Sequence, residues 1–145
     1  MTSKFEKIID YCATKSIRLT NQQSIIMKII SGTQLPLTAN DILLKLKELN
    51  STANRMTIHR ALEILVQAGL IHKVAFNHTY KLCNHLYCNH SHSCQIFVCQ
   101  NCYKQVEIHD SRITKMLQTI GKSYGFHVNH PIEITGKCNE CIQLK

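Results

Sequence analysis

Long apolar runs are missing from this 145-residue sequence. No stretch approaches the roughly 18 consecutive apolar residues of a membrane-spanning helix, so no membrane partner is expected. The first ten residues alternate charged with apolar side chains and have no signal-peptide core, which predicts a cytoplasmic protein. The sequence also has no His-Glu-x-x-His motif and no glycine-rich phosphate loop. These absences argue against a hydrolytic enzyme, and no small-molecule substrate is expected.

Acidic residues are scarce, with nine Asp and Glu against 17 Lys and Arg, for a net charge of +8. Residues 1–82 hold 11 of the basic and 5 of the acidic residues but only one of the eight cysteines. Residues 83–145 are nearly neutral and hold seven cysteines and six of the nine histidines. A basic domain usually binds an acidic partner, and nucleic acid is the commonest one. We therefore predict a DNA-binding domain at 1–82 and a metal-binding domain at 83–145.

Two Cys-x-x-Cys pairs dominate the second half: Cys99 with Cys102, and Cys138 with Cys141. Four thiolates in two such pairs form a complete tetrahedral shell for zinc. Because no coordination position stays open, this zinc would be structural and would not catalyse a reaction. Two disulfides or a redox dithiol are the alternatives, and the reducing cytoplasm disfavours them.

The first half shows four helical patterns followed by a hairpin. Ser3-x-x-Glu6, Thr20-x-x-Gln23 and Thr38-x-x-Asp41 resemble capping boxes, and Asn54 or a neighbour begins the fourth helix. Two β-prone runs, Leu70–Phe76 and Thr79–Leu82, flank the polar turn Asn77-His78. Helices followed by a hairpin predict a winged helix-turn-helix, whose fourth helix would enter the major groove of double-stranded DNA.

The outer face of that fourth helix supplies the predicted DNA contacts. Arg60 suits a two-pronged bond to guanine, and Thr57 suits a phosphate or a thymine methyl group. The predicted DNA-facing residues are Arg55, Thr57, His59, Arg60 and Glu63.

The second half predicts a β-β-α-β unit, so the fold class is α+β. The expected strands are 95–99, 105–108 and a returning strand made of 126–128 and 132–135, with a helix over about 110–125. A core of this size is small, and a zinc staple would offset that deficit. An exposed sheet edge and an apolar helix face favour pairing of two chains into a homodimer.

Further metal donors gather near the boundary between the two halves. One thiolate, two imidazoles and one carboxylate from this group would form a tetrahedral zinc site. Three alternatives stay open: His72 as a surface histidine, Cys83 as a small core residue, and residues 88–94 as a loop that binds metal loosely. The donors are His72, Cys83, His85, Cys88, His90, His92, Cys94 and Glu107.

The chain as a whole resembles the ferric uptake regulator family, and most closely its zinc uptake regulator branch. That family comprises dimeric, metal-activated bacterial repressors with an N-terminal winged helix and a C-terminal dimerisation domain. The resemblance is carried by Arg18-Leu19-Thr20-x-Gln22, Thr57-x-x-Arg60-Ala61-Leu62, Gly69-Leu70-Ile71-His72-Lys73-Val74, Tyr80-x-Leu82-Cys83, both cysteine pairs and Gly136-x-Cys138-x-x-Cys141.

The resemblance implies a zinc-responsive repressor of zinc uptake genes that binds a DNA operator as a zinc-loaded homodimer. It implies two zinc ions per subunit. The structural ion would be held by Cys99, Cys102, Cys138 and Cys141, and the regulatory ion by His72, Cys83, His92 and Glu107. A further metal site, present in some relatives, would draw on His90, His109, Asp110 and His130.

Three positions depart from the family pattern: His59 stands where a tyrosine is usual, and Asn21 and Gln23 replace a proline and an arginine. These departures affect the expected operator sequence more than the activity. A regulator that responds to iron, manganese or peroxide is the alternative within the family. Outside it, the alternative is a zinc-binding interaction or storage protein that never binds DNA.

Overall fold

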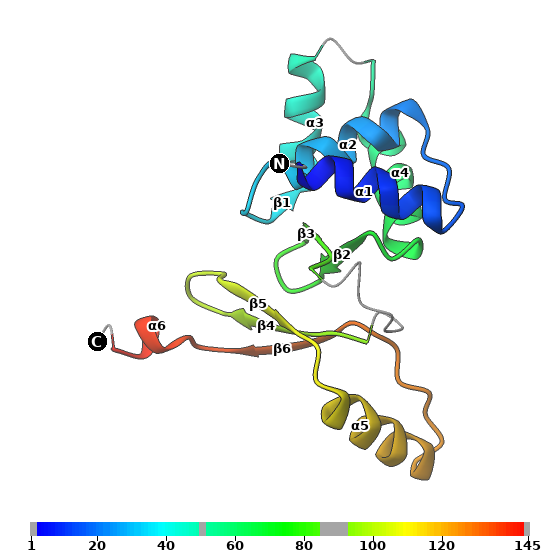
Figure 1. Ribbon diagram of the computed structural model, residues 1–145. Coiled ribbons are helices and arrows are strands. Elements are labelled where there is room, and N and C mark those ends of the chain that lie inside the picture. The colour runs from blue at the N-terminus through cyan, green and yellow to red at the C-terminus, as the bar shows by residue number, and fades with distance from the viewer. Residues whose placement is uncertain (1–2, 50–51, 85–92, 144–145) are drawn as a thin grey trace. The chain divides into compact units, whose positions relative to one another are not determined.

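The computed structural model describes residues 3–49, 52–84 and 93–143 (Figure 1). The chain forms two compact units, Met1–Tyr87 and Cys88–Lys145. The expected boundary at 82/83 lies shortly before this division, which itself falls within 85–92, outside the described residues. None of the helices in the described ranges is long and apolar enough to cross a membrane.

The first unit contains four helices and a small sheet. The helices are α1 (Lys4–Thr14), α2 (Asn21–Ser31), α3 (Ala39–Glu48) and α4 (Arg55–Gln67). Each begins with a capping box; those at Ser3, Thr20 and Thr38 are as predicted, and Asn54, predicted only as a possible start of α4, forms one with Thr57. A cap satisfies backbone N–H groups that the first helical turn leaves unpaired, and each is worth about 1 kcal/mol.

The apolar positions of these helices meet in one core. Ile26, Ile42 and Ile58 come from three different helices, and all three are fully buried. The helical spacing that predicted these faces is therefore confirmed. Ile9, Ala13 and Leu49, which the same spacing predicts to face inward, are exposed instead: Ile9 is 40% exposed, and Leu49 caps the C-terminus of α3 and is 62% exposed.

The predicted hairpin is present as β2 (Ile71–Val74) and β3 (Thr79–Leu82), paired antiparallel. Its predicted two-residue turn is wrong: β2 ends at Val74, which pairs with Thr79, so residues 75–78 form a four-residue turn. A short strand not predicted from the sequence, β1 (Leu37–Thr38), pairs with β3 and gives the sheet order β1-β3-β2. β1 has only two residues, which is too short to show the alternation of apolar and polar side chains by which a strand is predicted. The four helices and this three-stranded sheet form a winged helix-turn-helix.

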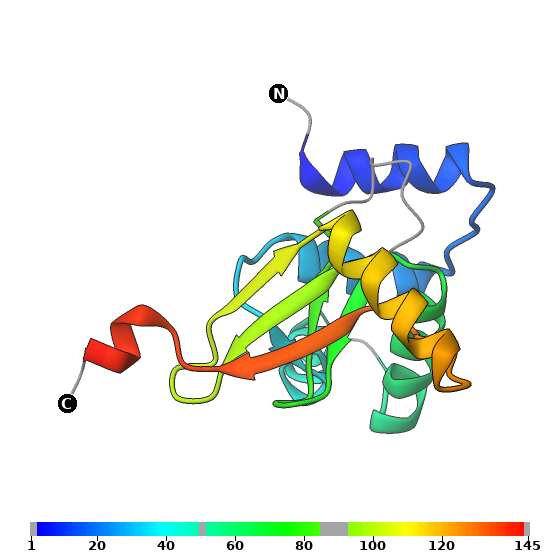
Figure 2. The ribbon, with the colours of Figure 1, turned by 90° about the horizontal axis from the view of Figure 1, so that it is seen from below.

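The second unit is the predicted β-β-α-β arrangement with a short helix added. Its elements are β4 (Gln95–Cys99), β5 (Gln105–Ile108), α5 (Ser111–Ser123), β6 (Ile132–Gly136) and α6 (Asn139–Gln143). Figure 2 shows the strands side by side, with β4 between β5 and β6. β4 runs antiparallel to β5 and parallel to β6, so α5 lies in the crossover connection.

The prediction that 126–128 contributes to the returning strand is wrong. The Phe126 amide donates to the Gly121 carbonyl (2.8 Å) and closes the C-terminal end of α5. Gly125 reverses the chain there with a φ of +76°, a conformation that glycine adopts without steric cost. The chain therefore joins the sheet only at Ile132, whose amide donates to the Cys94 carbonyl (3.1 Å).

Candidate metal centre and nucleic-acid interface

The two cysteine pairs meet at one end of the β4-β5-β6 sheet. The four Sγ atoms of Cys99, Cys102, Cys138 and Cys141 all lie within 4.8 Å of one another. Cys102 Sγ and Cys138 Sγ are 3.7 Å apart. In a regular tetrahedron with Zn–S bonds of about 2.3 Å, neighbouring sulfurs are about 3.8 Å apart. The four donors therefore fit zinc in both chemistry and spacing.

Local backbone geometry forms each half of this cluster. After β4, the chain turns so that the Tyr103 amide donates to the Cys99 carbonyl (3.0 Å). After β6, the Ile142 amide donates to the Cys138 carbonyl (3.0 Å), which is the first turn of α6. The β4-β6 pairing then brings the two turns together, because Cys99 lies opposite Gly136 in the register.

The backbone also favours thiolate character at one member of the cluster. N–H groups of Cys102 and Cys138 lower the pKa of the Cys99 thiol to about 6, and the Cys138 amide lies 3.4 Å from its sulfur. Hydrogen bonding to the Cys138 side chain raises the pKa of Cys141 to about 12. Four neighbouring sulfurs cannot all carry charge unaided, and a bound divalent cation removes that penalty. Every cysteine in the described residues is a free thiol, so no disulfide is seen among them.

His72 and Cys83 lie on the hairpin of the first unit. His72 is opposite Lys81 in the β2-β3 register, and the Cys83 amide continues the ladder by donating to the Leu70 carbonyl (3.1 Å). Cross-strand partners share a face, and so do residues two apart on one strand. His72 and Cys83 are therefore diagonal neighbours on one face of the hairpin. Both side chains are buried.

The remaining predicted regulatory ligands belong to the second unit. Glu107 lies on β5 opposite Ile96, and His92 lies outside the described residues. A carboxylate oxygen of Glu107 and Cys94 Sγ are within 4.8 Å of each other. Cys94 is one of the candidate donors named from the sequence, but the four ligands implied by the family resemblance do not include it. Whether ligands of both units share one ion stays a prediction.

The leftover donors in the second unit are differently engaged. Asp110 accepts two hydrogen bonds from the Arg112 guanidinium (3.1 and 2.8 Å) and one from its amide (2.9 Å), and caps α5. This pairing lowers the pKa of Asp110 to about 2. Burial, and then the charge of His109, lower the pKa of His130. His90 lies outside the described residues.

The outer face of α4 carries the predicted DNA-facing side chains. Arg55, His59, Arg60 and Glu63 are exposed. Thr57 is engaged differently: its hydroxyl donates to the Asn54 carbonyl (3.0 Å) and accepts from the Asn54 amide (3.1 Å). Thr57 therefore completes the capping box of α4 with the N-cap residue Asn54, and its proposed phosphate contact would compete with these bonds. Gln23 likewise caps α2 and is buried, whereas Asn21 is exposed.

Comparison with known proteins agrees with this architecture. The ferric uptake regulator family matches residues 14–135. The zinc uptake regulation protein of Escherichia coli strain K12 is 30% identical over 146 residues, covering all of this chain and 83% of that protein. The peroxide operon regulator of Bacillus subtilis strain 168 is 25% identical over 126 residues, covering 86% of this chain and 84% of that protein.

The structural match extends over both units. A solved zinc uptake regulator complexed with zinc and DNA has a TM-score of 0.82 and 28% identity, covering 97% of this chain and 93% of that one. The chain belongs to the ferric uptake regulator family, whose members are metal-responsive DNA-binding regulators and not enzymes.

Proposed function

We propose that this protein is a zinc-responsive repressor of zinc uptake genes, active in the cytoplasm as a homodimer with two zinc ions per subunit. The observation that carries the zinc assignment is the pair His72 and Cys83 on one face of the DNA-binding unit's hairpin. A sulfur and an imidazole together favour zinc over iron(II), because iron(II) sites are usually built from nitrogen and oxygen donors. The similarity to the E. coli zinc uptake regulation protein supports the same choice.

The structural ion in this proposal is held by Cys99, Cys102, Cys138 and Cys141. The sulfur spacing supports it, as do the backbone N–H groups around Cys99. A bound zinc would join the two turns and hold the end of the β4-β5-β6 sheet together. No open position is left for a substrate, so the role of this centre is structural.

The regulatory ion is held by His72, Cys83, His92 and Glu107. His72 and Cys83 belong to the winged unit, and His92 and Glu107 belong to the second unit. One ion bound by all four would therefore connect the DNA-binding unit to the dimerisation unit. Ligands that favour one domain arrangement shift the protein toward it. We infer that the linked arrangement is the one in which both recognition helices of a dimer face DNA, about one helical turn apart.

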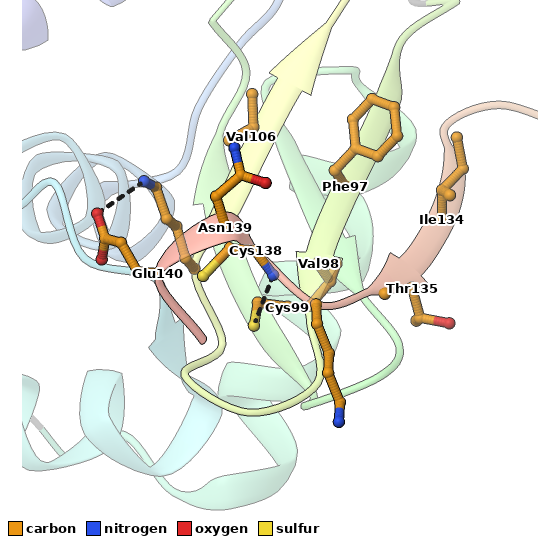
Figure 3. Close-up of a pocket in the computed structure, with 12 residues that line it drawn as sticks. Phe97, Val98, Cys99, Val106, Ile134, Thr135, Cys138, Asn139 and Glu140 are labelled. Carbon is orange, nitrogen blue, oxygen red and sulfur yellow. Dashed lines mark hydrogen bonds and ion pairs between the residues drawn. The ribbon is translucent and has the colours of Figure 1, made fainter. Parts of the chain in front are cut away.

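The second unit carries a surface suited to the homodimer. Phe97 lies opposite Val106 on β5 and Ile134 on β6, so the three side chains form one apolar row across the sheet. Figure 3 shows them lining a hollow together with Cys99 and Cys138. The volume of this hollow is about 620 Å³. Phe97 and Val106 are 41% and 45% exposed. Apolar side chains grouped in this way on a surface usually mark an interface.

The deciding experiment measures duplex binding across buffered concentrations of free metal. DNA sequences enriched by the protein from a random pool would be labelled, and anisotropy recorded with zinc, iron(II) and manganese(II). We expect zinc to induce tight DNA binding at a lower free concentration than iron(II) or manganese(II) does. A response to iron(II) or manganese(II) alone would support the alternative within the family, consistent with the match to a peroxide regulator.

The alternative of a zinc-binding protein without DNA activity makes a different prediction. Under this alternative, the protein should not bind duplex DNA at any metal concentration, and no salt-dependent binding should be detected. Contacts between lysine or arginine and phosphates release counterions, so real DNA binding weakens steeply as salt rises. The excess of basic residues over 1–82 and the exposed Arg55 and Arg60 favour DNA binding.

A further inference from the structure

Met56 is an apolar side chain held in water on the first turn of α4. It is 65% exposed, although the same helix buries Ile58, Leu62 and Leu65 in the core. The helix begins at Arg55, directly after its Asn54 cap. In a helix-turn-helix protein, the N-terminal residues of the recognition helix contact the base edges.

The position of Met56 around the helix is opposite to the core. Successive residues of an α-helix are separated by about 100°, so Met56 and Glu63 lie near the middle of the outward face. His59 and Arg60 lie on either side of that line, and both are exposed. Met56 is therefore an apolar side chain between the polar groups predicted to face the bases.

The neighbouring candidate for an apolar base contact, Thr57, is less accessible than Met56. The Thr57 hydroxyl is bonded to Asn54 in both directions, and its side chain is half-buried. The next exposed apolar side chain on α4 is Ile64, which lies two turns further on. On the first turn, the side chain that extends furthest from the core and can meet a methyl group is Met56.

We propose that Met56 determines operator specificity by contacting the C5-methyl group of a thymine in the major groove. The proposal rests on the DNA binding proposed above. Thymine is the base that presents a methyl group in that groove, and apolar side chains recognise it. The unbranched thioether of methionine adapts to such a surface without a fixed shape.

The test removes only the methyl group. DNA sequences enriched from a random pool by the metal-loaded, full-length protein would be remade with each thymine replaced in turn by deoxyuridine. Burying one methyl-sized group gives about a fourfold gain in affinity. The protein should therefore lose about fourfold at one thymine in each half-site and little at the others.

Variants then assign that loss to Met56. Met56→Ala and the polar, similarly long Met56→Gln should bind the thymine duplex about fourfold more weakly and should not distinguish thymine from deoxyuridine. Met56→Leu should retain the discrimination. Ile64→Ala, an exposed apolar position on the same helix, is the matched control and should discriminate as fully as the unaltered protein.

Equal affinity for thymine and deoxyuridine at every position would overturn the proposal, and so would full discrimination by Met56→Gln. A pool enriched with iron(II) and not with zinc would contradict zinc selectivity while leaving this test intact with iron(II). A pool that enriches no sequence with any metal would contradict both the DNA-binding function and the role of Met56.

Discussion

The backbone amide of Cys138 lies 3.4 Å from the sulfur of Cys99, although 38 residues separate the two cysteines in the chain. This contact joins the turn after β4 to the turn after β6. It places a hydrogen-bond donor on a sulfur that we assign to a structural zinc. The integrity of the second unit should therefore depend on this cluster.

Cys99→Ala should release the structural zinc and dissociate or unfold the second unit. Structural zinc sites supply about 10–16 kcal/mol of apparent binding free energy, which is folding free energy for a small domain. Zinc content per chain and elution from a sizing column provide the measurement. Cys12→Ala removes a buried cysteine of the first unit and should keep both zinc and dimer. Unchanged zinc content in Cys99→Ala would rule out the assigned ligands.

Cys83→Ser and His72→Ala should abolish zinc-dependent DNA binding and leave a folded dimer. Each removes one ligand of the regulatory ion and leaves the four-cysteine cluster untouched. Anisotropy across buffered free zinc, with a sizing column in parallel, separates the two roles. His78→Asn alters a histidine in the turn of the same hairpin and should respond to zinc normally. Asn is chosen because His78 has a φ of +54°, which Asn tolerates. If Cys83→Ser still responds to zinc, the regulatory set is wrong.

Cys94→Ser should change the metal spectrum of the regulatory site. The sulfur of Cys94 is within 4.8 Å of the Glu107 carboxylate and is buried, so we expect it to bind the same ion as a fifth ligand, beyond the four proposed above. Cobalt(II) substituted for zinc gives sulfur-to-metal absorption whose intensity rises with the number of bound thiolates. We expect a weaker band in Cys94→Ser and an unchanged one in Cys12→Ser. Equal bands in the two variants would leave Cys94 as a core residue.

Thr57→Val should destabilise the first unit by about 1 kcal/mol, because it removes the two hydrogen bonds of the Thr57 hydroxyl to Asn54 while keeping the side-chain shape and the bond from the Thr57 amide. Thermal unfolding measures the loss. The affinity for DNA should fall by the same factor for every duplex sequence, because the capping box positions the helix and contacts no base. A loss confined to one base position would instead indicate a direct contact by Thr57.

Phe97→Glu should shift the protein from dimer to monomer. A carboxylate in the apolar row of Phe97, Val106 and Ile134 would be buried without a partner in the dimer, which is unfavourable. Sedimentation at micromolar concentration measures the assembly state. Phe76→Glu is a matched control, because Phe76 is 40% exposed and lies in the first unit. A dimeric Phe97→Glu protein would place the interface elsewhere.

Local signals in the sequence determined most of the secondary structure. Ser3, Thr20, Thr38 and Asn54 each bond to a residue three positions later, so the start of every helix in the first unit could be read from a four-residue window. The hairpin and the first two strands of the second unit were equally local, because alternation and turn residues define them. The two Cys-x-x-Cys pairs identified the sulfur donors for the same reason.

Only the tertiary structure decided which of these local features lie close together. The convergence of four sulfurs depends on the parallel pairing of β4 with β6, and such pairing is not encoded in any short window. The accessibility of Thr57 and Met56 was decided in the same way: Thr57 is half-buried with its hydroxyl bonded to Asn54, whereas Met56 is 65% exposed. The sequence therefore determined the chemical groups, and the packing determined which of them are available.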